Sequence, residues 1–287
     1  MRLGLLISGG LGRIALSQLQ RSHQLIFVMT DKRSSEIINV CEKSGIRTYT
    51  GNPRRGNCSE FIRNVDIDVL ISVNYLFLIE ADLINLPKKC AFNIHGSLLP
   101  KYRGRTPHVW AIINDEKWTG ITAHVIDEGC DTGDILEQHR IRIEPNDTGT
   151  TILEKYAKAY PVLLNSVLES ISKNNLKPKP QKVEEGTYFG KRTPEDGLIN
   201  WDWHRKRIHN WIRAQSPPYP GAFSIVNQTR IVFESSAYSN LGFHYETKNG
   251  TILSVSPLIV KTPNGALELH LHQKSDAQIL KVNQQFE

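Results

Sequence analysis

An alternation of short apolar runs with helical patterns, in the first half of the chain, is the feature that most constrains its fold. The apolar runs, each predicted to be a strand, are residues 2–7, 24–30, 47–50, 68–73, 91–95 and 120–127. Between the first two runs, apolar side chains recur at helical spacing at Leu11, Ile14, Ala15 and Leu19. Residues 36–45 are predicted to form a second helix that ends at Gly45. This order predicts an α/β fold with a doubly wound, mostly parallel, Rossmann-like sheet.

A long amphipathic helix is predicted to follow at residues 147–171. Its apolar stripe consists of Ile152, Leu153, Tyr156, Leu163, Leu164, Val167, Leu168 and Ile171. Thr151 and Glu154 have the spacing of a capping box. Pro161 lies inside the pattern and predicts a kink or a break in this helix.

Changes in composition predict two domains joined by a linker. Residues 1–180 are predicted to be the catalytic domain, residues 181–199 a linker, and residues 200–287 a second domain. The second domain begins with a helix that is expected to bury Ile208, Trp211 and Ile212. Short strands are then predicted at residues 222–226, 230–235, 251–256, 258–262 and 266–272. This pattern predicts a small OB-like β-barrel.

The composition indicates a globular protein without a concentrated basic surface. Of the 287 residues, 39% are hydrophobic and 22% are charged. The net charge of +6 is shared about equally between residues 1–199 and 200–287, so we expect no nucleic-acid partner. No apolar run approaches the roughly 18 residues of a membrane span, and the first run is too short for a signal sequence. We therefore expect a cytoplasmic protein that does not contact a membrane.

Neither the cysteines nor the first glycines predict a familiar cofactor site. The four cysteines are Cys41, Cys58, Cys90 and Cys130. Because they are widely spaced, we expect them to be reduced and mostly buried. Gly9, Gly10 and Gly12 lack the spacing of a dinucleotide-binding fingerprint, which favours a tight turn between strand and helix over NAD binding. The helix start at Gly10 could still receive a substrate phosphate.

Polar side chains interrupt the strand at residues 91–95, which is otherwise apolar. Asn93 and His95 are two residues apart and therefore share one face of the strand. Ligands of a doubly wound sheet bind at the carboxyl ends of its strands, so this face is expected to meet a substrate. An Asn N–H can stabilise an oxyanion, and a His can accept a proton from an attacking amine. The pair suits acyl transfer to an amine.

An acidic segment, "DEGCDTGDILEQ" at residues 127–138, follows the last predicted strand of the first half. It could be a solvated turn or a metal site, although its residue order does not match the calcium loop of an EF-hand. Alternatively, one of its carboxylates could orient the imidazole of His95 or stabilise its charged form.

These motifs together resemble those of the 10-formyltetrahydrofolate-dependent formyltransferases. The resemblance rests on "FNIHGSLLPKYRG" at residues 92–104 and on Asp131, which follows His95 by 36 residues within a "DTGD" motif. It continues through "TYFGKRTPEDGLINWDW" and "PPYPGAF" into the second domain. The resemblance implies that Asn93, His95 and Asp131 form the catalytic centre, that 10-formyltetrahydrofolate is the co-substrate, and that no metal takes part.

Two acceptors occur among two-domain members of this family. The sequence favours a nucleotide-linked amino sugar over methionyl-tRNA, because the segment after the first strand reads "SGGLGRIAL" and no basic insertion follows it. Residues 188–201 and 217–224 look closest to the formyltransferase part of the enzyme that formylates UDP-4-amino-4-deoxy-L-arabinose. The resemblance therefore implies formylation of a UDP- or dTDP-linked 4-amino sugar for surface polysaccharide or lipopolysaccharide (O-antigen) synthesis.

The resemblance also implies where each substrate binds. The residues expected near the pterin of the co-substrate are Val73, Tyr75, Ile126, Asp127 and Glu128. Those expected near the acceptor are Gly10, Ser97, Lys101, Tyr102, Arg103 and Arg105. We also expect a homodimer, with the barrel serving dimerisation, acceptor binding or both.

Three alternatives stay open at this point. The acceptor could be methionyl-tRNA, which would make binding steeply salt-dependent. The enzyme could hydrolyse formyltetrahydrofolate without an acceptor, but that reaction would not explain the presence of the second domain. The chain could instead be a non-catalytic nucleotide-binding or assembly protein, but Asn93, His95 and Asp131 at family spacing argue against that.

Overall fold

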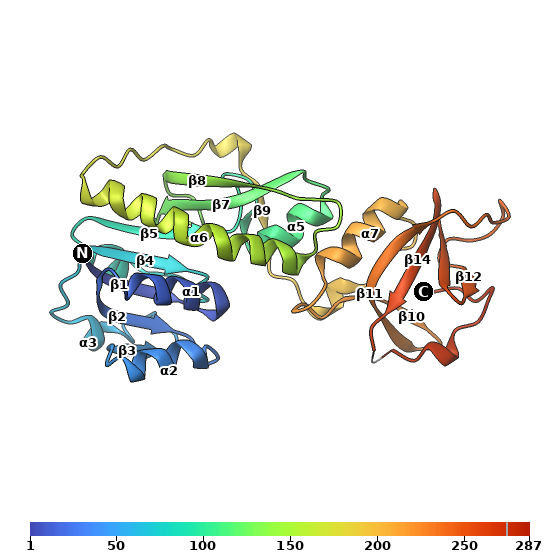
Figure 1. The fold of residues 1–287 in the computed structure, drawn as a ribbon, viewed down its shortest axis with the longest axis horizontal. Helices are drawn as coiled ribbons and strands as arrows, with labels where there is room; N and C mark the ends of the chain where they lie inside the picture. Colours follow the sequence, from blue (N-terminus) through green and yellow to red (C-terminus); the bar gives the residue numbers. More distant parts are fainter. Residues whose placement is uncertain (274) are drawn as a thin grey trace. The chain divides into compact units, whose positions relative to one another are not determined.

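The computed structural model describes residues 1–273 and 275–287, which form two compact units. The first unit consists of Met1–Gly104, Thr119–Ile141 and Glu154–Phe189. The second consists of Arg105–Trp118, Arg142–Leu153 and Gly190–Glu287. Figure 1 shows the elements of both.

The first unit is built on a seven-stranded sheet with the order β3-β2-β1-β4-β5-β7-β8. Its strands are β1 (Arg2–Ile7), β2 (Gln24–Thr30), β3 (Thr48–Thr50), β4 (Val69–Val73), β5 (Cys90–His95), β7 (Trp118–Val125) and β8 (Ile135–Arg142). Strands β1 to β5 pair in parallel, and β7 runs antiparallel to β5. The mostly parallel, doubly wound sheet is thus confirmed. Strand β8 was not predicted from the sequence, because most of its side chains are polar and half of them are exposed.

The central parallel strands β1 and β4 are buried on both faces apart from Arg2, as their apolar sequences require. All five residues of β4 are buried, for example. The connecting helices are α1 (Gly9–Leu19), α2 (Ser35–Lys43), α3 (Ser59–Ile62) and α4 (Ala81–Ile84). At the carboxyl edge of the sheet, Asn74 donates its side-chain N–H to the carbonyl of Ser8 over 3.1 Å, which joins the ends of β4 and β1.

Helix α6 (Gly149–Ser172) covers the sheet beside α1 (Figure 1). All the stripe residues predicted for it are buried except Leu153, which is half-buried. The hydroxyls of Tyr156 and Tyr160 donate to the carbonyls of Gly96 at 2.7 Å and Ile94 at 3.4 Å, so the helix is anchored to the end of β5.

Two details of α6 differ from expectation. The helix continues through Pro161, so the predicted break is wrong; the half-buried proline is accommodated inside one 24-residue helix. The reciprocal cap joins Thr148 and Thr151 rather than Thr151 and Glu154, since each threonine hydroxyl accepts from the backbone N–H of the other. The cap therefore lies at Thr148, three residues before the expected one, and the helix begins at Gly149.

The second unit contains a five-stranded antiparallel sheet with the order β10-β11-β14-β13-β12. Its strands are β10 (Ala222–Val226), β11 (Thr229–Ser239), β12 (Ile252–Val255), β13 (Leu258–Thr262) and β14 (Gly265–Leu271). Its helices are α5 (Pro107–Ile113) and α7 (Arg205–Ala214). Ile208, Trp211 and Ile212 of α7 are buried, as predicted.

This sheet is an antiparallel half-barrel, which confirms the predicted small OB-like β-barrel domain. Strands β10 and β12 are the two ends of the strand order and do not pair with each other. Residues 283–287 bridge them instead. Glu287 donates its backbone N–H to Ile225 over 2.9 Å, and Ile252 donates to Gln284 over 2.8 Å.

The burial of α6 yields a test of this packing. Replacing the fully buried Leu164 with alanine should lower the free energy of unfolding by about 2–5 kcal/mol, because it leaves a cavity between helix and sheet. Val162 lies on the same helix with 59% of its surface exposed, and its alanine variant should stay within about 0.5 kcal/mol. Urea unfolding of both variants measures the difference. Equal losses would contradict the packing described.

Candidate active site

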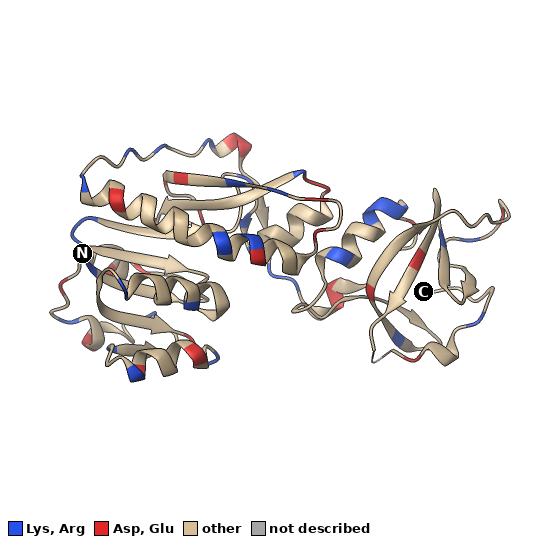
Figure 2. Cartoon of the chain, in the orientation of Figure 1, with Lys and Arg blue, Asp and Glu red and all other residues tan. Residues whose placement is uncertain are grey.

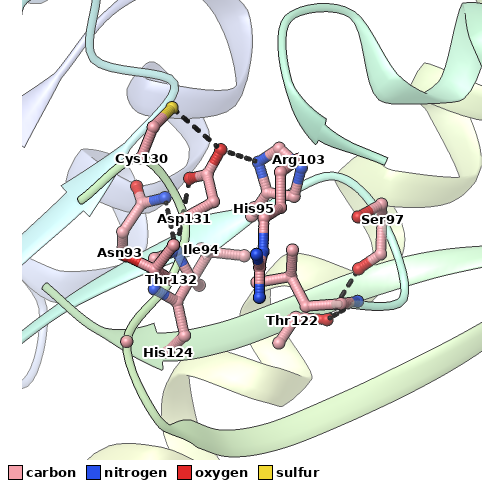
Figure 3. A network of polar contacts seen from close by, with 12 residues as sticks. Asn93, Ile94, His95, Ser97, Arg103, Thr122, His124, Cys130, Asp131 and Thr132 are labelled. Atoms are coloured by element: carbon pink, nitrogen blue, oxygen red, sulfur yellow. Dashed lines mark hydrogen bonds and ion pairs between the residues drawn. The ribbon is translucent and has the colours of Figure 1, made fainter. Parts of the chain in front are cut away.

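Asn93 and His95 lie at the carboxyl end of β5, where the catalytic residues were expected. In the pairing of β5 with β7, Asn93 stands opposite His124 and His95 opposite Thr122. His95 is buried, whereas Asn93 is half-buried. Figure 3 shows that their side chains and Asp131 converge in one polar network.

The hydrogen bond of His95 to the backbone fixes which ring nitrogen carries its proton. Nε2 lies 2.8 Å from the carbonyl oxygen of Tyr102, and a carbonyl can only accept, so Nε2 carries a hydrogen. The other nitrogen, Nδ1, lies 3.4 Å from Oδ2 of Asp131. In the neutral ring Nδ1 holds a lone pair, so a proton that arrives there is received between the imidazole and a carboxylate.

The backbone of Asp131 is held in an uncommon conformation that aims its carboxylate at His95. Its φ angle is 56°, a left-handed value that few residues other than glycine adopt. The backbone N–H of Gly104 donates to Oδ2 over 2.9 Å. Burial disfavours the ionised carboxylate, but His95, His124 and the Gly104 N–H outweigh burial and hold the pKa of Asp131 well below its ordinary value.

Burial has the opposite consequence for the imidazole. It lowers the pKa of His95 below its ordinary value, and Asp131 and the Tyr102 carbonyl offset only part of that fall. At neutral pH the pair therefore consists of a neutral His95 and an ionised Asp131, which is the state that can accept a proton.

His124 is a member of the network that the sequence analysis missed. Its Nδ1 donates to the carbonyl of Val125 at 2.8 Å, and its other ring nitrogen, Nε2, faces the network. That Nε2 lies 3.1 Å from the side-chain nitrogen of Asn93 and 3.5 Å from Oδ1 of Asp131. His124 therefore orients the Asn93 amide. A histidine inside an otherwise buried apolar strand was the available signal, but its partner depends on the register of β7 against β5.

Of the five residues expected near the pterin, Tyr75 and Ile126 meet in one apolar cluster. Tyr75 packs against a cluster that contains Ile126, and it also contacts Phe77 edge to face at a centroid distance of 5.4 Å. Val73, at the end of β4, is fully buried. The Tyr75 hydroxyl is buried and has no hydrogen-bond partner among the described residues. Of the expected residues at the start of the acidic segment, Asp127 is half-buried and bonded to Thr132, and Glu128 is exposed.

Four of the six residues expected near the acceptor lie in the part of the first unit that directly follows β5. Ser97 is buried, and its hydroxyl donates to the carbonyl of Lys101 over 2.6 Å, so it stabilises the loop. Tyr102 is largely buried and stacks on Phe189. Lys101 is exposed, and Arg103 is half-buried in the first unit.

The two other residues of this set are exposed. Arg105 belongs to the second unit. Gly10 lies in the first turn of α1, where a Cβ would meet no atom within 4 Å. In the described part of the chain, no hydrogen bond or ion pair joins Gly10 to Asn93, His95 or Asp131.

Among the described residues, no group of three or more His, Cys, Asp or Glu side chains could hold a metal ion. All four cysteines are free thiols. Cys41 and Cys58 are buried, but Cys130 is exposed beside Asp131, contrary to the expectation of mostly buried thiols. No helix in the described part of the chain has the length and hydropathy needed to cross a bilayer.

Comparison with known proteins assigns the chain to a family. A model described as formyl transferase matches residues 15–168, and one described as formyl transferase, C-terminal domain, matches residues 191–287. The first match alone covers more than half of the chain. The chain therefore belongs to the formyl transferase family, which confirms the resemblance drawn from the Asn-x-His strand and the "DTGD" segment.

Individual relatives refine this comparison. The chain is 38% identical over 221 residues to the bifunctional polymyxin resistance protein ArnA of Wigglesworthia glossinidia brevipalpis. The match covers 77% of this chain but 33% of ArnA, so the chain spans about a third of the length of that relative.

Solved structures share the fold across nearly the whole chain. WlaRD, a sugar 3N-formyl transferase crystallised with dTDP and 5-N-formyl-THF, is 23% identical with a TM-score of 0.70, covering 96% of this chain and 98% of WlaRD. A 4-N formyltransferase from Francisella tularensis is 24% identical with a TM-score of 0.69, covering 82% of this chain and 96% of that enzyme.

The His95–Asp131 pair predicts a pH dependence of the enzyme. If neutral His95 is the base, kcat/KM should fall on the acid side with a midpoint below 6.5, the ordinary pKa of histidine, because burial lowers this pKa. In Asp131→Asn the negative charge that raises the His95 pKa is lost, so the midpoint should move to still lower pH. A pH–rate profile of both proteins checks this. A midpoint that is unchanged or higher in Asp131→Asn would refute the pairing.

Proposed function

We propose that this chain transfers a formyl group from 10-formyltetrahydrofolate to the amine of a nucleotide-linked amino sugar. The observation that carries the proposal is the arrangement of His95 and Asp131, in which Nδ1 can receive a proton beside an ionised carboxylate. An attacking amine must lose a proton as its bond to the formyl carbon forms, and this pair is built to take it.

The side chains at the end of β4 fit a folate co-substrate. Tyr75 and Ile126 offer an apolar wall, and the Tyr75 hydroxyl is a buried polar group that has no hydrogen-bond partner among the described residues. Buried hydroxyls are normally hydrogen-bonded, so a ligand that presents a polar edge against an apolar face would complete this site. WlaRD, with a similar fold, was crystallised with a formylated tetrahydrofolate.

Each catalytic side chain has one role in the proposed reaction. Asn93 stabilises the negative charge that develops on the formyl oxygen; its amide has two N–H groups, and the contact with His124 uses one of them. Nδ1 of His95 accepts the proton lost by the amine, and Asp131 stabilises the resulting imidazolium. As the bond from the formyl carbon to N10 breaks, the same proton passes to N10, directly or through water, and tetrahydrofolate leaves.

The acceptor is assigned from the relatives and from the charges of the chain. WlaRD and the Francisella enzyme are described as acting on a sugar 3-amine and as a 4-N formyltransferase. Figure 2 shows Lys and Arg interspersed with Asp and Glu in both units. We propose a UDP- or dTDP-linked 4-amino sugar of surface polysaccharide synthesis as the acceptor. The cytoplasmic location and the homodimer stay predictions.

The basic side chains of helix α7 make contacts within the second unit. Lys206 pairs with Asp115, and Arg213 is buried and donates to the carbonyl of Asp147. The guanidinium groups of Arg205 and Arg207 lie over the rings of Tyr238 at 5.1 Å and Trp203 at 4.8 Å. These contacts favour a structural role for the helix.

Removing the oxyanion donor tests the role of Asn93. Asn93→Ala should lower kcat by roughly 10²–10³-fold and leave the protein folded, because the amide acts mainly on charge that develops during the reaction. Asn39→Ala, on the exposed face of α2, is the matched control and should keep full activity. Turnover of Asn93→Ala within a few-fold of the wild type would refute this role.

The acceptor is tested by assaying tetrahydrofolate release from 10-formyltetrahydrofolate with each candidate separately. The candidates are UDP- and dTDP-linked 3-amino and 4-amino sugars and charged initiator methionyl-tRNA. Turnover with a 4-amino sugar alone is the expected result. Turnover with tRNA alone would keep the chemistry of His95 and overturn the acceptor, and release without any acceptor would indicate a hydrolase.

A further inference from the structure

Residues 179–189, which were expected to belong mostly to the linker, pack onto the active site of the first unit. We call this segment the strap. It begins at Lys179, whose backbone exchanges two hydrogen bonds of 2.8 and 2.9 Å with Ile135 at the start of β8. It includes the 3₁₀ turn η1 (Val183–Glu185) and ends in β9 (Tyr188–Phe189), which pairs in parallel with β6 (Arg103–Gly104). The strap therefore adds a short strand beside residues 96–104, which we call the acceptor loop because the acceptor is expected there.

The pairing of β6 with β9 fixes the backbone groups that contact the catalytic pair. Thr187 accepts the backbone N–H of Tyr102 on its hydroxyl at 2.8 Å and that of Arg103 on its carbonyl at 2.9 Å. Tyr102 and Gly104 are the residues whose carbonyl and N–H bind His95 and Asp131. Gly104 has a φ angle of 95°, and a Cβ there would overlap the carbonyl oxygen of Phe189, so the two strands can approach only at a glycine.

Gln181 is the side chain of the strap that reaches the loop containing Asp131 and Gly133. Its Nε2 donates to the carbonyls of Asp131 at 2.9 Å and Gly133 at 2.7 Å. Its Oε1 accepts two hydrogen bonds from Arg103, from Nη2 at 2.8 Å and from Nε at 3.2 Å. Carbonyls only accept and a guanidinium only donates, so the orientation of this amide is unambiguous. Both its donors and its acceptor are in use.

These contacts act on the strained residue of the site. Asp131 adopts a left-handed backbone that costs on the order of 1 kcal/mol or more and needs support from its surroundings. Gln181 binds the carbonyl of Asp131 itself and that of Gly133 two residues on, and it joins both to Arg103 in the acceptor loop. The carboxylate of Asp131 is held from the other side by Gly104, the neighbour of Arg103.

We propose that Gln181 is a positioning residue, which keeps the carboxylate of Asp131 in contact with Nδ1 of His95. This inference rests on the proposed function for the reaction concerned. Without the two N–H donors of Gln181, the backbone of Asp131 can relax from its left-handed conformation and carry the carboxylate away from His95. Misplacement of a catalytic group by about 1 Å can cost on the order of 10²-fold in rate.

Two substitutions separate the contacts of Gln181. Gln181→Met has similar length and removes every hydrogen bond. Gln181→Glu keeps an acceptor for Arg103 but lacks the donors to Asp131 and Gly133. Both variants should lose on the order of 10²-fold in kcat, with KM for each substrate within about twofold. Full activity in Gln181→Glu would show that only the bond to Arg103 matters and would overturn the proposal. A rise in KM at unchanged kcat would overturn it too.

A matched control distinguishes positioning from general stability. Gln18 is another half-buried glutamine of the first unit, and it bonds the carbonyl of Pro161 at 2.9 Å and the side chain of Asn165 at 2.7 Å. Gln18→Met should shift the urea midpoint in the same way as Gln181→Met but leave kcat unchanged. If both methionine variants lost activity in proportion to their stability, Gln181 would be an ordinary structural residue.

An NMR titration of His95 tests the proposal without any substrate. Asp131 raises the pKa of His95, so a displaced carboxylate should lower it in Gln181→Met relative to the wild type. An unchanged titration in a folded Gln181→Met would overturn the positioning role. The proposed function is tested separately and would be wrong if the wild type formylated no amino sugar. In that event the titration of His95 would still decide whether Gln181 positions Asp131.

Discussion

The contact between the buried carboxylate of Asp131 and the buried imidazole of His95 is the interaction on which the rest of the site depends. An ionised group at low exposure is costly unless charges and donors surround it. Here the N–H of Gly104 donates to Oδ2, and the rings of His95 and His124 lie 3.4 and 3.5 Å from the two carboxylate oxygens. Every segment that contacts Asp131 is thereby fixed in place: the end of β5, strand β7, and the loop that contains β6. The contacts that stabilise the buried carboxylate of Asp131 therefore also determine its position relative to His95.

The antiparallel strand β7 changes what a parallel sheet can offer. In a purely parallel edge, side chains of neighbouring strands converge only at their carboxyl ends. Because β7 runs against β5, the middle of β7 lies opposite the end of β5, and His124 and Thr122 face Asn93 and His95. Thr122 in turn donates to the carbonyl of Ser97 and supports the loop that follows. Two strands thus furnish a polar site inside a largely apolar sheet.

Sequence patterns predicted the parts of the structure that follow from local periodicity. The buried strands, the α6 stripe and the inward side chains of α7 are visible as runs and repeats because each buries a continuous apolar surface. The polar strand β8 carries no such signal, and the bridged half-barrel depends on pairing between distant residues.

The site divides in the same way between local and distant information. The spacing of Asn93 and His95 marks the end of β5, and the family resemblance supplies Asp131. His124 lies 31 residues from Asn93, and Gln181 lies 48 to 78 residues from its partners, so only the register of β7 and the path of the strap reveal these contacts. A segment rich in Pro, Lys and Gly indicates only that no core element is present; its hydrogen bonds with the active site depend on the fold.

Because two tyrosines of α6 anchor the end of β5, the order of the site depends on a single helix. The carbonyls that Tyr160 and Tyr156 bind belong to Ile94 and Gly96, the two neighbours of His95 in the chain. Local opening of a protein occurs in cooperative segments, each with its own free energy. When α6 detaches, His95 loses both of its flanking restraints at once, while the paired strands β1 to β4 can stay intact. The free energy of opening α6, rather than that of global unfolding, then sets the fraction of molecules in which His95 keeps both restraints.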